Sequence, residues 1–370
     1  MANELFSHLR TFSETDWLDA IQELQNDIHP VDQDAVNIWF RFFPLELRLY
    51  IEAAEDRKEA ERVLSLQGNY MLEDSLDSSH HFLYGHRYWA HVKAAVNEES
   101  ASFKGDAKQG LVELIKAVSS NAAKKADVDQ KLLNAIAAVG LATFNQVGAE
   151  EFQKTAGDVA KPKGAMAGSA DAVIAAREKD DSQGLFGFLK TVDKKFSVSY
   201  AAEDYSGKFQ VYDDQEITQA AGQDRSRDWR ALDQRCWQGP IPIECTAAAC
   251  GTCWVGVLGG KEKLDPVQRR ERYNVQLQGY KQPNEERPYL RLACQARAHG
   301  NVTLVIPPWN GVFGKQIYKD VEERELEPNT TSAKHLREAI AEGTHNVPNG
   351  GSDTDESDAD DTPTSQTPHY

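Results

Sequence analysis

Four of the five cysteines in this 370-residue chain share one spacing pattern, which constrains the fold more than any other sequence feature. Cys245, Cys250 and Cys253 form C-x4-C-x2-C, and Cys294 follows after 40 intervening residues. A disulfide framework is typical of small secreted chains with an even cysteine count, and the N-terminal sequence MANELFSHLRTFSETDW does not resemble a secretory signal. The thiols therefore indicate metal ligation.

The spacing is that of a plant-type [2Fe-2S] site, in which a loop supplies three thiolates and a distant strand end the fourth. Such a site needs two thiolates on each iron and backbone N–H donors for its sulfides, and the small residues 246–252 let the main chain approach closely. Two alternatives remain. Structural zinc usually takes two C-x2-C knuckles, of which the chain has one, and four unligated cysteines can pack as small apolar residues.

The segments around these cysteines resemble the [2Fe-2S] ferredoxin family over about residues 195–310. ACGTCWVGVLGG is similar to the last two loop ligands running into a strand, and LRLACQARAHGNVTLVIPP is similar to the region of the fourth ligand. The resemblance implies a β-grasp fold, a [2Fe-2S] cluster bound by Cys245, Cys250, Cys253 and Cys294, and one-electron transfer at about −400 mV.

Two features depart from the family pattern. Many members have glycines after the first ligand, whereas this chain has Thr246 and Ala247, so a loop position that needs a positive φ is expected to be strained. The segment 273–289, YNVQLQGYKQPNEERPY, is interpreted as an insertion near the cluster that serves docking.

The periodicity of apolar residues changes along the chain and predicts an α+β protein. Helical spacing predicts an all-helical domain over 1–154, with no family resemblance, and Ala/Gly/Lys-rich sequence predicts a linker over 155–184. Alternation in KFSVSY, GKFQVYDD, WVGVLGG and NVTLVIP predicts strands of a β-grasp, [2Fe-2S] ferredoxin-like domain over 185–320. A short helical extension over 321–345 and a disordered acidic tail over 346–370 are expected to follow.

Two further groups of residues are candidates for chemistry. Cys236 is interpreted as a packed residue rather than a ligand or a redox sensor, and Trp237 and Trp254 are expected to shield the cysteine loop. Four histidines, His80, His81, His86 and His91, form the densest histidine cluster. On one helix His80 and His91 share a face, so a packing surface is favoured over a haem or second metal site.

Charge and motifs exclude several functions. A formal net charge of −17 argues against nucleic acid and anionic membranes and favours redox partner proteins with a basic docking surface. No apolar run is long enough to span a membrane, so we expect no membrane insertion and a cytoplasmic protein. Dinucleotide-binding, phosphate-binding and hydrolase motifs are not found, which separates the chain from fused reductases.

We therefore expect a non-enzymatic one-electron carrier whose helical domain is a docking or assembly module. One alternative is an electron-transfer subunit of a larger redox complex. Another is an iron-sulfur redox sensor or scaffold, supported only by Cys236 and the acidic tail.

Overall fold

The computed structural model describes residues 3–69, 71–104, 109–178, 194–281, 284–311 and 314–318. All of the described residues belong to one compact unit. The helical extension predicted over 321–345 and the acidic tail predicted over 346–370 lie outside the described residues. The domain boundaries drawn from the sequence stay predictions.

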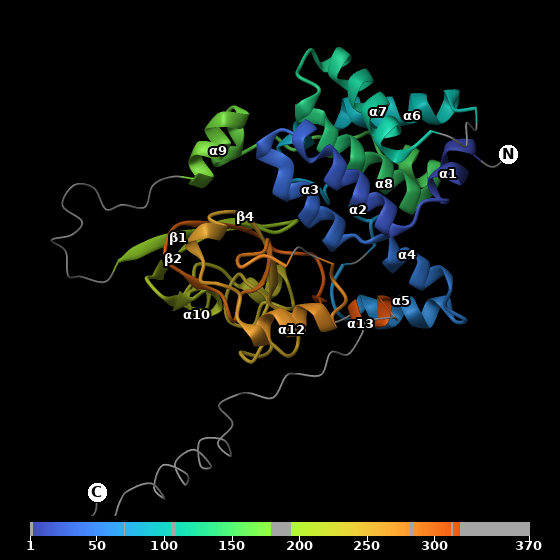
Figure 1. Cartoon of the computed structure of the whole chain (residues 1–370). Coiled ribbons are helices and arrows are strands. Elements are labelled where there is room, and N and C mark those ends of the chain that lie inside the picture. The colour runs from blue at the N-terminus through green and yellow to red at the C-terminus, as the bar shows by residue number, and fades with distance from the viewer. Residues whose placement is uncertain are drawn as a thin grey trace, which may run out of the picture. The chain divides into compact units, whose positions relative to one another are not determined.

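The N-terminal part of the chain is helical, as predicted (Figure 1). Ser13 begins α2 with a capping box, in which its hydroxyl accepts from the Asp16 N–H and the Asp16 carboxylate accepts from the Ser13 N–H. Pro30 occupies the first turn of α3, and Pro44 separates α3 from α4 because its ring cannot continue a helix. The helices are α1 Glu4–Leu9, α2 Glu14–Glu23, α3 Pro30–Phe42, α4 Leu45–Glu52, α5 Arg57–Ser65, α6 Trp89–Ser102, α7 Leu111–Ala126 and α8 Lys131–Lys154.

Helix α8 is the central helix of this region. Its length and composition alone would allow it to cross a membrane, but 72% of its most apolar window is buried inside the protein. It contacts α3, α6 and α7, and Gly148 breaks its regular geometry with φ 84°. A buried helix of this kind is apolar all round because it has neighbours on every side.

The C-terminal part forms a five-stranded mixed sheet in the order β2-β1-β7-β4-β5, which is the β-grasp arrangement expected. Strand β1 pairs antiparallel with β2 and parallel with β7, while β4 pairs antiparallel with both β7 and β5. Two-residue strands β3 and β6 form a separate small sheet. The bounds are β1 Lys195–Ala201, β2 Ser206–Tyr212, β3 Gln215–Glu216, β4 Trp254–Gly259, β5 Leu290–Leu292, β6 Arg297–Ala298 and β7 Val302–Val305, with α10 Ile217–Ala221, α11 Trp229–Leu232, α12 Arg269–Leu277 and α13 Gly314–Ile317.

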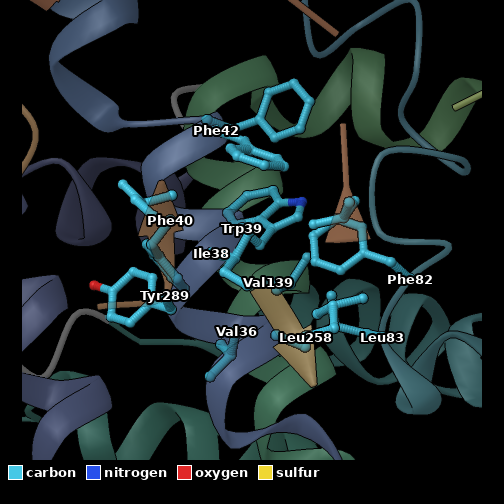
Figure 2. Close-up of a cluster of buried hydrophobic side chains, with 14 of the residues drawn as sticks. Val36, Ile38, Trp39, Phe40, Phe42, Phe82, Leu83, Val139, Leu258 and Tyr289 are labelled. Atoms are coloured by element: carbon cyan, nitrogen blue, oxygen red, sulfur yellow. The ribbon is translucent and has the colours of Figure 1, made fainter. Parts of the chain in front are cut away.

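The helical part and the sheet share one hydrophobic core. Helix α3 contacts β4, and Figure 2 shows Leu258 and Tyr289 from the sheet region among Ile38, Trp39 and Phe40 of α3. A further helix, α9 Ala170–Glu178, lies within the segment predicted as a linker and contacts both α3 and β4. The helices therefore cover part of the sheet directly.

Candidate metal centre

The structure brings the four spaced cysteines together at one end of β4. The irregular segment that carries Cys245 and Cys250 ends where β4 begins, one residue after Cys253. Cys294 follows β5 by two residues, and the Ala293 N–H donates to the Cys253 carbonyl at 2.9 Å. Cys253 and Cys294 are buried, whereas Cys245 and Cys250 are partly exposed. The site therefore has a buried side and a solvent-facing side.

The thiols are arranged as two pairs. Cys245 hydrogen-bonds Cys250, and Cys253 hydrogen-bonds Cys294. Within the described residues, no three or more Cys, His, Asp or Glu side chains converge on a point that suits a single metal ion. Two thiolates for each of two irons fit this arrangement, whereas a tetrahedral zinc needs all four thiolates at one point.

Within each pair, one thiol is more acidic than the other. A hydrogen bond from Cys253, opposed by burial, lowers the pKa of Cys294 to about 7, and that same bond together with burial raises the pKa of Cys253. Burial opposes the shift at Cys245, but N–H groups of the loop and the Cys250 thiol outweigh it and lower the pKa of Cys245. Burial raises the pKa of Cys250. In each pair the thiol with the lowered pKa gives up its proton more readily, and the thiolate is the form that binds iron.

Backbone N–H groups of the loop point at the sulfurs. Those of Ala247, Ala249 and Cys250 donate to Cys245, and that of Ala248 donates to Cys294. Fixed donors of this kind stabilise negative charge on sulfur and tune the potential of an iron-sulfur cluster. The small residues predicted to bring the main chain close to the cluster are the ones that supply these donors.

The strained loop position lies at Ala248. Its φ is 60°, in the left-handed region that disfavours a β-carbon, and the side chain is buried. Gly251 also has a positive φ, of 70°, at no comparable cost. The expected strain therefore falls on Ala248, whereas Thr246 and Ala247, which stand where many family members have glycine, do not have a positive φ.

Gln295 links the two halves of the site and was missed by the sequence reasoning. Its Nε2 donates to the Thr246 carbonyl at 3.0 Å and lies 3.6 Å from the Cys294 sulfur. Gln295 directly follows the fourth cysteine, and this position in the motif is the sequence signal that could have identified it. Gln295 holds the fourth thiol against the loop that carries the first.

The two tryptophans near the loop behave differently from each other. Trp254 is buried, as expected of a shielding residue: its ring stacks on Tyr280 at 4.5 Å between centroids and lies 5.2 Å from Phe42. Trp237 is 56% exposed, so the shielding predicted for it is not seen. Tyr280 belongs to the predicted insertion over 273–289, which begins inside α12 and packs on Trp254 just after that helix ends.

Cys236 is a packed residue, as predicted. It is 1% exposed, its sulfur lies 3.3 Å from the Tyr205 hydroxyl, and burial raises the pKa of its thiol to about 12. A protonated, enclosed thiol is a poor nucleophile and a poor ligand.

Three of the four histidines meet, but not in the predicted combination. His80 and His86 share a hydrogen bond of 2.9 Å between their Nδ1 atoms, and the His81 ring lies 4.4 Å from that of His86. His91 is exposed on α6, so the prediction that His80 and His91 share a helical face is wrong. The reason is that residues 71–88 form turns and a short 3-10 helix instead of one α-helix.

The comparisons with known proteins agree with this geometry. Residues 211–299 match a family model described as a 2Fe-2S iron-sulfur cluster binding domain. No curated protein and no solved structure shows significant similarity to the chain. The matched segment contains all four cysteines, while β1 and β7, which lie outside it, complete the sheet. The domain binds a [2Fe-2S] cluster and supports electron transfer, and the helical region matches no family.

Proposed function

We propose that this protein is a cytoplasmic, non-enzymatic one-electron carrier with a single [2Fe-2S] cluster held by Cys245, Cys250, Cys253 and Cys294. The observation that carries the proposal is the arrangement of these thiols in two pairs within the matched domain. When bound, the cluster supplies reversible one-electron chemistry.

The residues around the cluster have different roles in this proposal. The thiolates of the buried pair anchor the site, and the N–H groups of the loop offset the negative charge on the sulfurs. Trp254 and Phe42 exclude water on the buried side, while partial exposure of Cys245 and Cys250 leaves the other side for exchange with a partner.

The helical region serves, in this proposal, as a docking or assembly module attached rigidly to the cluster domain. Contacts of α3 with β4, and of Phe42 in α3 with Trp254, support a fixed arrangement. A subunit role in a larger redox complex is the second candidate, favoured by exposed Leu49 and Leu66 near α4 and α5. The redox-sensor alternative loses support because the Cys236 thiol is buried and its pKa is raised.

The partner is proposed to be a redox protein with a basic docking surface, because the chain carries a formal net charge of −17. Long-range attraction of this kind accelerates association and weakens as salt screens it. Association rates should therefore fall with added salt, and rates indifferent to ionic strength would argue against a basic partner.

Electron paramagnetic resonance tests the cluster directly. The anaerobically purified full chain should be silent when oxidised and show an S = 1/2 signal, integrating to about one spin per chain, after dithionite reduction. Replacement of Cys253 with Ser should abolish or alter the signal, whereas replacement of Cys236 with Ser should leave it unchanged. Zinc in place of iron, with no signal on reduction, would overturn the proposal.

A further inference from the structure

An exposed aromatic and cationic patch lies on the segment that leads into the cysteine loop. Trp237 is 56% exposed and Leu232 is 45% exposed, which makes them two of the four large apolar side chains found exposed among the described residues. The Arg230 guanidinium lies over the Trp237 ring, 3.7 Å from its centroid. We name Arg230, Leu232 and Trp237 the Trp237 patch.

The loop that carries Trp237 is held firmly on both sides. The Tyr205 hydroxyl contacts the Cys236 sulfur at 3.3 Å and donates to the Pro240 carbonyl at 3.1 Å. Arg225 donates to the Gln238 carbonyl at 2.6 Å. Trp237 is therefore displayed by a fixed backbone, and a docking partner would pay little ordering entropy at this point.

The same loop is directly connected to the exposed side of the candidate cluster site. The Ile243 N–H donates to the Arg235 carbonyl at 3.3 Å, which closes the loop, and Cys245 follows two residues later. Cys245 belongs to the partly exposed pair. A partner seated on the Trp237 patch would thus contact the segment that leads directly into the solvent-facing thiols.

The side chains of the patch are suited to bind a carboxylate at a protein–protein interface. Trp and Arg are the residues most enriched where binding energy is concentrated. Stacking on Trp237 uses the face of the Arg230 guanidinium and leaves its edge N–H groups directed outward, and no carboxylate of the described residues forms an ion pair with it. Arg225 and Arg227 are exposed in the same segment, whereas Asp228 is occupied by capping α11.

We propose that the Trp237 patch is the contact point for a second, acidic redox partner protein, distinct from the basic one that the net charge favours, which presents a carboxylate beside an apolar side chain. The carboxylate pairs with the edge of Arg230, and the apolar side chain packs on Trp237 and Leu232. The inference rests on the proposed carrier function and adds the site of docking. The overall acidic charge acts at long range, whereas this patch acts at contact distance, so the two make separate predictions.

Two probe proteins of opposite charge test the patch. Flavodoxin is an acidic one-electron acceptor and cytochrome c is a basic one, and second-order rates of electron transfer from the reduced full chain are measured with each. Replacing Arg230 with Glu should slow transfer to flavodoxin about tenfold, the loss expected of a contact residue of this class, without slowing transfer to cytochrome c. Replacing Trp237 with Ala should slow transfer to flavodoxin several-fold, and replacing it with Phe should restore most of the rate.

The controls match charge and exposure elsewhere on the chain. Arg57→Glu changes the net charge equally and lies on an exposed face of α5, and Leu66→Ala removes an apolar side chain that is 68% exposed. Both should leave the flavodoxin rate within about twofold of the original. If Arg57→Glu slows transfer as much as Arg230→Glu does, net charge rather than the patch is responsible and the proposal is overturned.

A binding measurement without electron transfer completes the test. Trp237 is labelled with fluorotryptophan, assigned through the Trp237→Phe variant, and its ¹⁹F resonance is followed as oxidised flavodoxin is added to the oxidised full chain. The resonance should shift with flavodoxin and remain in place in the Arg230→Glu variant. An unshifted resonance in a chain with a normal cluster signal overturns the patch alone, whereas loss of the paramagnetic signal overturns the carrier function.

Discussion

At the scale of single residues, Ala248 shows the cost of building the cysteine loop without glycine at this position. Its φ of 60° costs a residue with a β-carbon about 1 kcal/mol, while its buried methyl group contributes roughly 0.8 kcal/mol. Because these contributions nearly cancel, Ala248→Gly should leave the free energy of unfolding almost unchanged. The exposed neighbour Ala249 is not among the residues with a positive φ, so Ala249→Gly should lower the free energy of unfolding by about 0.5–1 kcal/mol. Thermal melts of the cluster-loaded chain compare the two variants. Equal losses of stability would contradict the claim that the backbone at Ala248 is strained.

The buried histidine pair makes stability depend on pH. Burial, with a smaller contribution from His81, lowers the pKa of His86 to about 3, and burial also lowers the pKa of His80 well below its usual value. An unfolded histidine titrates near about 6.5, so between pH 6.5 and 3 the unfolded chain binds protons that the folded chain does not. The stability present above pH 6.5 should therefore decline as the pH falls through this range.

Urea unfolding at pH 7, 6 and 5 checks this dependence. His86→Asn should make the free energy of unfolding fall less steeply with decreasing pH than in the original chain. Exposed His91 offers the matched control, because His91→Asn should keep the original slope. Identical slopes in all three proteins would show that other groups govern acid stability.

At the scale of elements, a buried ion pair connects α12 to β5 close to the fourth cysteine. Arg291 donates to Glu271 from Nε at 2.7 Å and from Nη2 at 2.9 Å, and both side chains are fully buried. Glu271 also accepts from the Leu292 N–H at 2.7 Å, two residues before Cys294. Helix α12 thus supports the strand end that positions the fourth thiol.

Removing the Glu271 charge should therefore affect both stability and cluster retention. Glu271→Gln leaves the buried Arg291 with a single carboxylate partner, Asp265 at 3.2 Å, so the loss should lie near the lower end of the about 3–5 kcal/mol typical of a broken buried pair. The matched variant Glu286→Gln breaks an exposed pair with Arg287 and should cost less than about 1 kcal/mol. Denaturant unfolding gives the free energies, and loss of visible absorbance under a chelator gives the release rate. Equal rates of cluster release in the two variants would show that α12 does not help to hold Cys294 in place.

Sequence periodicity predicted the long elements and missed those whose position depends on distant contacts. Alternation identified β1, β2, β4 and β7, but β3, β5 and β6 are only two or three residues long, too short to show a period. The helical face drawn through His80 and His91 failed because turns fill residues 71–88. For the site, cysteine spacing predicted which four thiols belong together and proposed them as ligands, whereas the position of Gln295 depends on a contact with Thr246 that no spacing rule encodes.

At the scale of the whole molecule, the shared core joins two regions that the sequence presents as separate. The sequence sign of this contact lies in α3. Trp39, Phe40 and Phe42 are all buried there, although they point to different sides of the helix. One side packs within the helical region, and another meets the sheet, where Phe42 lies 5.2 Å from Trp254. Such a helix needs two sets of neighbours, but its sequence does not say which ones.

The shared core should make the helices and the sheet of residues 1–322 unfold together. Gly256 of β4 faces α3 so closely that an added Cβ would lie 2.6 Å from Ile38 Cγ2. Gly256→Ala should therefore destabilise the chain by about 1–3 kcal/mol through overpacking, and Ile38→Ala, which removes Cγ2, should reduce that cost in the double variant because the two residues are in contact. Helical circular dichroism and cluster absorbance should lose their signals at one shared midpoint, which Gly256→Ala lowers for both. If helicity persists after the cluster signal is lost, or if the two substitutions are additive, α3 and β4 are not parts of one cooperative core.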